Sequence, residues 1–466
     1  MASYSKKELF ESVPVSEALK AMAVPTIISQ LINLVYNMVD AFFIGRTGSS
    51  YMMAATTVTL TLTLLNVAFS NLFGVGGGSQ VARLMGQKKD DEARAAAAFS
   101  FCGAILLALS YSLLIGCFMN PVLRFLGASD MTIGFAREYT VFVIVIGSLP
   151  AMLSLTLAHL LRNTGYSSQA SFGLSFGGVL NMILDPLFMF VLLPRGSEVK
   201  GAAIATLLSN ICACIYLLRA YYAASERAPL SMSPKDAGHI TAANRKAIFT
   251  VGIPSAILTG LFDLANICVN ILSAAHSDLV LAAMGIVMKV ERIPNAVNIG
   301  ICQGMLPIVA YNYSSGNHRR MKETVDTART WGIIVSLCSI VLLEIFAPQV
   351  TRVFLSVSEG GAEEAKIVLD YAAMFLRIRC LASIFQLLNY HASFCMQAMG
   401  NGRGTMLHAL VRELVFYIPC MFLLDRLFGE AGLASALVVG EALGACFATF
   451  LLRRVMGRNS GANPAG

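Results

Sequence analysis

Four polar side chains recur at helical spacing within an otherwise apolar stretch near the start of the sequence: Gln30, Asn33, Asn37 and Asp40. Spacings of three, four and three residues place them on one face of a helix, and Tyr36 flanks the same face. A charged residue at the centre of a membrane helix costs about 2.5 to 3.5 kcal/mol on insertion scales, so it needs a partner or a function. We therefore interpret this face as one wall of a polar site.

A second polar group follows further along the chain. Asn181 and Asp185 are four residues apart and are therefore neighbours on a helix, and Pro186 removes a backbone donor directly after them. Thr206 ends the small-residue stretch GAAIAT, which permits close helix contact. Two carboxylates in a site of low dielectric constant cannot easily both ionise, so one tends to hold a proton, and several oxygens together suit Na+. These residues predict a cation site, for H+ or Na+, formed by Asp40, Asn181, Asp185 and Thr206.

The second half of the sequence has its own polar face, at Thr259, Asp263, Asn266 and Asn270. The spacing is again helical. We expect Asp263 and Asn266 to line a substrate cavity, together with Gln303 from the next apolar segment and with Gln30, Asn33, Tyr36 and Asn37 from the first.

Further charged residues lie inside the later apolar segments. We expect these to form structural ion pairs, because charged pairs within a bundle often fix packing; they are Lys289, Glu291, Arg292, Arg412 and Glu413. The first three could pair with one another or with Asp263, and Arg412 stands next to Glu413.

Composition decides which elements must hold these residues. Of the 466 residues, 56% are hydrophobic and 13% are charged, and the mean hydropathy is +0.68, which is typical of a membrane protein. The apolar segments have the length that crosses a bilayer as a helix, about 20 residues, and are too long for barrel strands. We count twelve such segments, at residues 19–45, 52–80, 94–119, 137–160, 169–193, 201–223, 247–275, 280–309, 324–346, 369–397, 405–427 and 431–455.

The distribution of Lys and Arg between the connecting loops predicts the orientation. With the N-terminus in the cytoplasm, the inside segments hold 21 basic residues and the outside segments hold 8. This bias predicts that both termini are cytoplasmic, and it accounts for the net charge of +7 without a nucleic acid. Residues 1–18 do not read as a cleavable signal peptide, so we expect the first helix to stay in the mature protein.

Cysteine and histidine give no sign of a cofactor. All 11 cysteines fall inside predicted helices, where they suit packing as small apolar residues, and no Cys or His cluster has metal-ligand spacing. No nucleophile with a nearby base stands out, and His159 and His391 are isolated. We therefore expect a protein that is not an enzyme, with no cofactor besides a coupling ion.

The chain also contains an internal repeat. AVPTIISQLINLVYN aligns with GIPSAILTGLFDLAN, which pairs Pro25 with Pro254 and Asn37 with Asn266, and the offset stays between 229 and 236 residues along the repeat. Two halves of the same topology predict two six-helix bundles around a cavity. The predicted division is a cytoplasmic segment 1–18, an N-lobe 19–223, a cytoplasmic linker 224–246, a C-lobe 247–455 and a cytoplasmic tail 456–466.

Several of these motifs together resemble one known family. VPTIISQLINLVYNMVDAFFIGRTG, GVGGGSQVARLMGQKKDDEARAA, NMILDP, GAAIAT and LAAMGIVMKVERIPNAVNIGICQGMLPIVAYNYSSGN look like the MATE family of multidrug and toxic compound extrusion transporters, in particular its MepA-like bacterial branch. The likeness extends over nearly the whole chain. It implies an all-helical fold of two bundles that alternate between outward-facing and inward-facing states, and export of drugs driven by a gradient of H+ or Na+.

The resemblance also implies site residues and partners. It places the cation site of related transporters on Asp40, Asn181, Asp185 and Thr206. Another branch uses a carboxylate on the seventh helix; Asp263 lies near that place but is not clearly in register, and the partner carboxylate on the tenth helix has no counterpart here, which puts a C-lobe ion site in doubt. The expected substrates are amphipathic cationic drugs or dyes, the surroundings are the lipids of a bacterial cytoplasmic membrane, and the protein is expected to be monomeric.

Rival functions remain open at this point. A lipid-linked oligosaccharide flippase of related shape would line its cavity with basic residues for pyrophosphate; the first polar face is acidic and rich in amides instead, although Arg377 and Arg379 keep this alternative open. A membrane enzyme lacks a recognisable catalytic motif. A channel fits less well than a transporter, because the repeat and the ion cluster favour alternating access.

Overall fold

The computed structural model describes residues 6–354 and 362–460, and the described part of the chain is built from helices without strands. The all-helical membrane fold predicted from composition is thereby confirmed. The helices of the first half are α1 (Lys6–Glu11), α2 (Val15–Gly45), α3 (Ser50–Gly86), α4 (Asp90–Cys117), α5 (Met119–Phe125), α6 (Ile133–Thr140), η1 (Val141–Ile146), α7 (Ser148–Asn163), α8 (Ser167–Pro186), η2 (Leu187–Leu192) and α9 (Glu198–Ser225). The elements named η are π-helical.

After the short helix α10 (Pro234–Gly238), the second half follows the same scheme. Its elements are α11 (Ala242–His276), α12 (Asp278–Ser314), α13 (His318–Phe354), α14 (Ala362–Cys380), α15 (Ser383–Ala398), α16 (Gly402–Leu410), η3 (Val411–Tyr417) and α17 (Ile418–Ser460). Side-chain caps start several of them: Thr241 accepts from the backbone N–H of Asn244, and Ser277 accepts from that of Val280.

Twelve crossings follow from these elements. By length and apolar composition, nine of the described helices could span a membrane, or ten when the bent pair Ile133–Ile146 and Ser148–Asn163 counts as one span. The stretch Gly402–Met456 counts once there but holds two crossings, because the chain turns at Gly429, which has a φ of +60°. Helices α14 and α15 together form the remaining crossing. It is less apolar because α14 carries Arg377 and Arg379.

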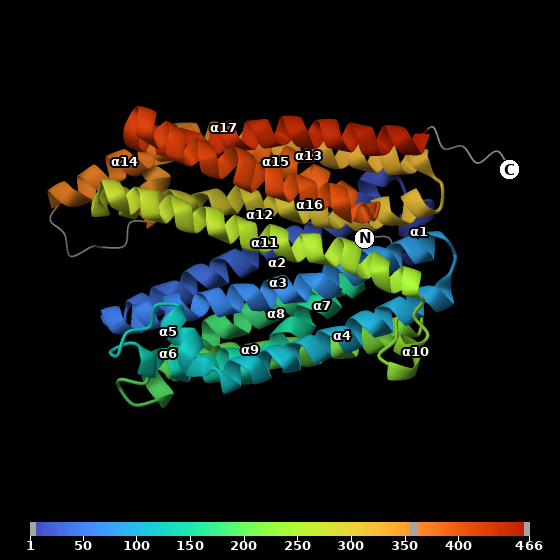
Figure 1. Ribbon diagram of the computed structural model, residues 1–466, viewed down its shortest axis with the longest axis horizontal. Helices are drawn as coiled ribbons and strands as arrows, with labels where there is room; N and C mark the ends of the chain where they lie inside the picture. The colour runs from blue at the N-terminus through green and yellow to red at the C-terminus, as the bar shows by residue number, and fades with distance from the viewer. Residues whose placement is uncertain (1–5, 355–361, 461–466) are drawn as a thin grey trace.

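The two halves meet at one end of the molecule and separate at the other (Figure 1). We call α2 to α9 the first half and α11 to α17 the second half. Helix α2 packs on α12 and α3 packs on α11. The halves approach closely at Gly76 and Gly252, where a side chain would collide with the backbone of the opposite helix at Ile248 and Leu72.

Polar contacts join the halves at this same end. Ser79 donates to the backbone carbonyl of Gln397 at 2.6 Å, and Gln80 donates to the side chain of Asn244 at 2.9 Å. Helix α1 lies there too, where the side chain of Asn312 donates to the carbonyl of Phe10 at 3.1 Å. The joined end is the predicted cytoplasmic end, and the ribbons of the two halves diverge toward the predicted outside (Figure 1).

Candidate functional site

The predicted cation-site residues of α8 and α9 lie together inside the first half. The side-chain amide of Asn181 donates to the Asp185 carboxylate at 3.3 Å and to the Thr206 hydroxyl at 3.3 Å. All three are buried, and Asp185 is 0% exposed. The helix changes to π-helical geometry directly after Pro186, so the cluster stands where the regular hydrogen-bond ladder of the span is interrupted.

Asp40 on α2 faces the same cluster. It lies within electrostatic range of Asp185, and Tyr36 one turn earlier lies near both carboxylates. Three buried oxygens here have no hydrogen-bond partner among the described residues: Asp40 Oδ1, Asn181 Oδ1 and Asp185 Oδ2. Buried oxygens without donors are costly unless they bind a proton, a cation or water. The arrangement is therefore suited to binding a small cation.

Tyr139 completes the cluster and was missed by the sequence reasoning. It lies on α6, where its phenol interacts with the Thr206 hydroxyl and is near Asp40 and Asp185. The sequence does show a tyrosine in the fourth apolar segment. Nothing in the sequence shows that the fourth segment packs beside the first, fifth and sixth, so this member could not be found from spacing.

A cavity of about 350 Å³ opens beside the cluster. Gln30, Asn33 and Tyr36 from α2 line it together with Asn181 and Thr206, as predicted for the first wall. Gln303 reaches it from the second half, and the side chain of Gln30 donates to that of Gln303 at 3.2 Å. Its walls also contain polar residues that we did not predict: Thr63, Asn66, Asn71, Ser154, His159, Arg162, Ser209 and Asn210.

The structure does not bring the remaining predicted cavity residues to this place. Asn37 is exposed and its side chain donates to the backbone carbonyl of Asn33 at 2.6 Å. Asp263 is half-buried and faces Arg292. Asn266 lines a separate small cavity inside the second half. Asp263 and Asn266 of α11 therefore do not line the first-half cavity, whereas Thr259 accepts a hydrogen bond at 3.1 Å from Asn71, which does.

Three of the five charged residues expected to form ion pairs do so, and Glu291 and Arg412 have principal partners that we did not expect. Glu291 holds Arg379 through two hydrogen bonds, of 2.6 and 3.0 Å. Arg412 holds Glu441 in the same way, at 2.6 and 3.0 Å, and lies 3.5 Å from Glu413. Lys289 and Arg292 are exposed and make no ion pair within the described ranges.

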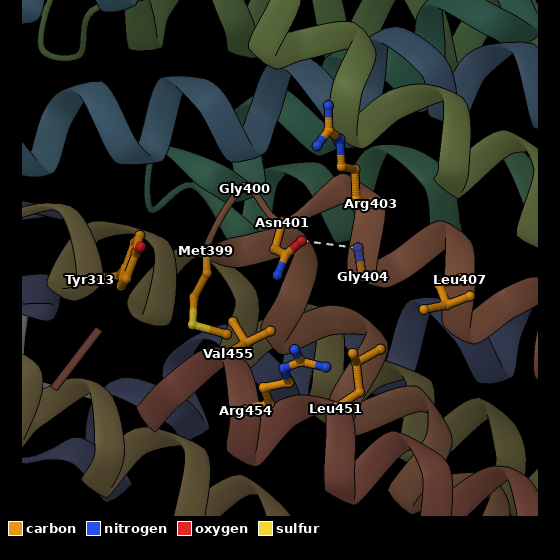
Figure 2. Close-up of a pocket in the computed structure, with 10 residues that line it drawn as sticks. All are labelled: Tyr313, Met399, Gly400, Asn401, Arg403, Gly404, Leu407, Leu451, Arg454 and Val455. Atoms are coloured by element: carbon orange, nitrogen blue, oxygen red, sulfur yellow. Dashed lines mark hydrogen bonds between the residues drawn. The ribbon is translucent and has the colours of Figure 1, made fainter. Parts of the chain in front are cut away.

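A larger cavity, of about 570 Å³, lies at the predicted cytoplasmic end of the second half (Figure 2). It is bordered by the turn between α15 and α16 and by the end of α17, and Figure 2 shows Arg403 and Arg454 on its opposite sides. No carboxylate borders it. It lies at the predicted cytoplasmic surface, so it is not a candidate for the cation chemistry.

Comparison with known proteins places the chain among transporters. The MatE family model matches residues 25–187 and 254–423, two segments that begin at Pro25 and Pro254 and support the predicted repeat. The chain is 28% identical over 453 residues to the multidrug export protein MepA of Staphylococcus haemolyticus strain JCSC1435, covering 96% of each chain. It is 27% identical over 451 residues to MepA of Staphylococcus aureus strain MRSA252, covering 95% of each.

Solved structures show the same fold. A MATE protein in complex with MaL6 superposes with a TM-score of 0.91 at 20% identity, covering 98% of this chain and 100% of that one. An outward-facing multidrug resistance MATE family transporter of the MOP superfamily gives a TM-score of 0.91 at 19% identity, with 99% and 100% covered. A MOP superfamily transporter from Pyrococcus furiosus Vc1, described as having a binding pocket of reverse polarity, gives 0.90 at 19% identity, with 99% and 100% covered.

Proposed function

The chain belongs to the MatE family, and we propose that it is a secondary active multidrug efflux transporter. It exports amphipathic, mostly cationic organic compounds in exchange for H+ or Na+ by alternating access. One observation supports this most directly: two buried carboxylates with unpartnered oxygens, Asp40 and Asp185, lie beside residues that line a cavity inside the first half. The MepA relatives are named as multidrug export proteins, which agrees with this function.

The cluster at Asp40 and Asp185 couples the cation to the drug. A proton or Na+ that reaches it from outside neutralises one carboxylate and changes the hydrogen bonding of α2. The shift of α2 alters the cavity wall formed by Gln30, Asn33 and Tyr36 and lowers the affinity for a bound drug. Coupling requires only that cation and drug stabilise different states, so that each weakens the binding of the other by the same free energy.

The cavity chemistry favours organic cations. Its walls combine a tyrosine ring with several amides, and the carboxylates of Asp40 and Asp185 lie close by, so the site attracts positive charge and accepts varied shapes. We propose that the protein acts as a monomer in a bacterial cytoplasmic membrane with both termini in the cytoplasm.

The flippase alternative is not favoured. Arg379, which kept it open, is paired with Glu291, Arg377 lies 4.0 Å from Glu344, and neither arginine lines the first-half cavity. The walls of the first-half cavity hold one arginine, Arg162, and one histidine, His159, among a tyrosine and several amides, and so lack the several guanidinium or ammonium groups that a pyrophosphate requires.

Dye flux in proteoliposomes tests this function. A pH gradient and a Na+ gradient are imposed separately on vesicles containing the wild-type protein, Asp40→Asn, or Asp130→Asn. Asp130 is a matched control, because it is an exposed aspartate paired only with Arg124. We expect one gradient to drive uptake of a fluorescent cationic dye in the wild type and the control, and at least a tenfold loss in Asp40→Asn. Unchanged transport in Asp40→Asn would contradict the assignment.

A further inference from the structure

The second half buries an unusual group of charges around a cavity of about 30 Å³. Three glutamates border it, Glu291 from α12, Glu413 from η3 and Glu441 from α17. Arg379 from α14 borders it as well, and Arg412 lies behind, in contact with two of the glutamates. All of these side chains are at most 11% exposed. Charges this deep in a membrane protein call for a structural or functional reason.

Each arginine donates two hydrogen bonds to one of the glutamates. Arg379 makes two hydrogen bonds to Glu291, and Arg412 makes two to Glu441. Glu441 also accepts from the side-chain amide of Asn389 at 2.6 Å. Two of the three carboxylates are therefore fully supplied with donors.

Glu413 is the exception. It is 1% exposed, lies 3.5 Å from Arg412, and neither of its carboxylate oxygens accepts a hydrogen bond from any described residue. The group has one negative charge in excess, with three carboxylates against two guanidinium groups. Arg292 also borders the cavity, but it is exposed and faces Asp263. Adding this arginine together with Asp263 to the group leaves the excess of one negative charge unchanged. A buried carboxylate without donors is far more stable when it carries a proton.

The position of Glu413 matches that of the first-half cluster within the repeat. Glu413 follows Asp185 by 228 residues, close to the repeat offset of 229 to 236, and Glu441 follows Thr206 by 235. Both acidic residues adjoin π-helical turns: η2 follows Asp185 directly and η3 contains Glu413. Such turns within helices are frequent at functional sites. Asn266, which pairs with Asn37 in the repeat, lines the second-half cavity.

We propose that Glu413 is a second proton-binding site, which takes up and releases a proton during the transport cycle. The inference rests on the proposed function for its role in transport. The titratable and charged groups that face Glu413 are Glu441 from α17, Arg412 and Tyr417 from η3, Tyr390 from α15, Arg379 from α14, and Glu291 with Arg292 from α12.

Proton release from Glu413 changes the packing of the second half. The ionised carboxylate of Glu413 competes with that of Glu441 for the guanidinium of Arg412. The Arg412 nitrogens lie 3.5 Å from Glu413 and 2.6 Å from Glu441. Arg412 links η3 to α17, so a change of partner moves one membrane segment against the next. This gives the proton a mechanical consequence within the second half.

Thermal unfolding of the full-length protein against pH tests the site without requiring transport. Because the buried carboxylate of Glu413 receives no hydrogen bond from the described residues, its ionised form is disfavoured in the folded protein, and we expect wild-type stability to fall as the pH rises through the range in which Glu413 ionises. Glu413→Gln removes that loss, and we expect its unfolding midpoint to exceed that of the wild type by an amount that grows with pH. Glu291→Gln is the matched control: it strands Arg379, so we expect a lower midpoint at every pH.

Two results would overturn the proposal. One is a pH profile for Glu413→Gln that runs parallel to the wild type, and the other is a loss of stability at every pH like that of Glu291→Gln. If Glu413→Gln does not fold, the infrared carbonyl band of a protonated carboxylic acid is measured instead at neutral pH in an Asp40→Asn, Asp185→Asn background. We expect the band to be present, and its absence would refute the site.

The role in transport is tested separately by stoichiometry. In proteoliposomes, the membrane potential that stops dye flux reports how many protons accompany each dye molecule. We expect one proton fewer per dye in Glu413→Gln than in the wild type, and an equal count would refute the role in the cycle. A chain that shows no gradient-driven transport at all would refute the proposed function while leaving the stability test of Glu413 intact.

Discussion

Three unpartnered oxygens decide what the first-half cluster can bind. Asp40, Asn181 and Asp185 each contribute one, and none is reached by a donor among the described residues. The side-chain amide of Asn181 donates to both Asp185 and Thr206 at 3.3 Å, which is long for a strong hydrogen bond. The oxygens therefore remain free to receive a proton or a cation from the cavity.

Tyr139 provides a specific test of this arrangement. Tyr139→Phe removes the phenol that interacts with Thr206 and faces both carboxylates, while it keeps the ring. A hydrogen bond of this kind contributes about 0.5 to 1.5 kcal/mol, or more when it reaches a charged group, so we expect ion affinity to fall about three- to tenfold. The ion concentration that gives half-maximal dye transport measures this effect. Tyr51→Phe, an exposed tyrosine on α3, is the control and should leave it unchanged.

Competition between cation and drug also predicts a pH dependence of drug binding. Protons favour the state in which the carboxylates are neutral, whereas an organic cation favours the state in which one is ionised. Dye affinity of the purified protein is therefore expected to rise as the pH increases, by up to about tenfold per pH unit when one proton is released. Equilibrium dye fluorescence measures it. A pH-independent affinity in the wild type would contradict proton coupling at this site, and an unchanged slope in Asp185→Asn would assign the proton elsewhere.

At the scale of elements, the contact between α3 and α11 holds the predicted cytoplasmic end closed. Gly252 lies against the backbone of Leu72, and Gly76 against that of Ile248, so the two helices touch without side chains between them. Ser79 and Gln80 add hydrogen bonds from α3 to the second half. These contacts exist only while the halves are joined at this end, and alternating access requires them to break.

Gly252→Leu is expected to shift the protein toward the inward-facing state. The added side chain has no space against the Leu72 carbonyl, so the joined end is destabilised by about 1 to 3 kcal/mol, typical of overpacking. Labelling of a cysteine placed at Gln80 by a thiol reagent that cannot cross the membrane measures the opening, in a background lacking the native cysteines. Gly260→Leu on the same helix is the control, because nothing lies within 4 Å of its added carbon. Equal labelling in both variants would contradict this role.

At the scale of the whole molecule, the helical fold, the repeat and much of the first-half site were predictable. Asp40, Asn181, Asp185 and Thr206 could be found because polar residues are rare in apolar segments and share helix faces. These four do lie on neighbouring helices of the first half, although their role as a cation site stays a prediction.

What could not be predicted depends on which helices are neighbours. Tyr139 joins the cluster only because α6 packs on α9. Glu441 escaped notice because its partner Arg412 lies 29 residues away, beyond the turn at Gly429. Asn37 shares the polar face of Asn33 in sequence, but its side chain donates to the backbone of its own helix and does not line the cavity. Periodicity identifies a face, and only packing decides what that face meets.

Exchange itself is the central claim, and driving it in reverse tests it most directly. Proteoliposomes containing the wild type, Asp40→Asn or Asp185→Asn are given a gradient of a cationic dye and no ion gradient. The account predicts that dye moving down its gradient drives H+ or Na+ the opposite way in the wild type, at a fixed ratio, and that both variants lose this ion movement. Dye movement without any opposing ion movement, or opposing ion movement that persists in both variants, would contradict it.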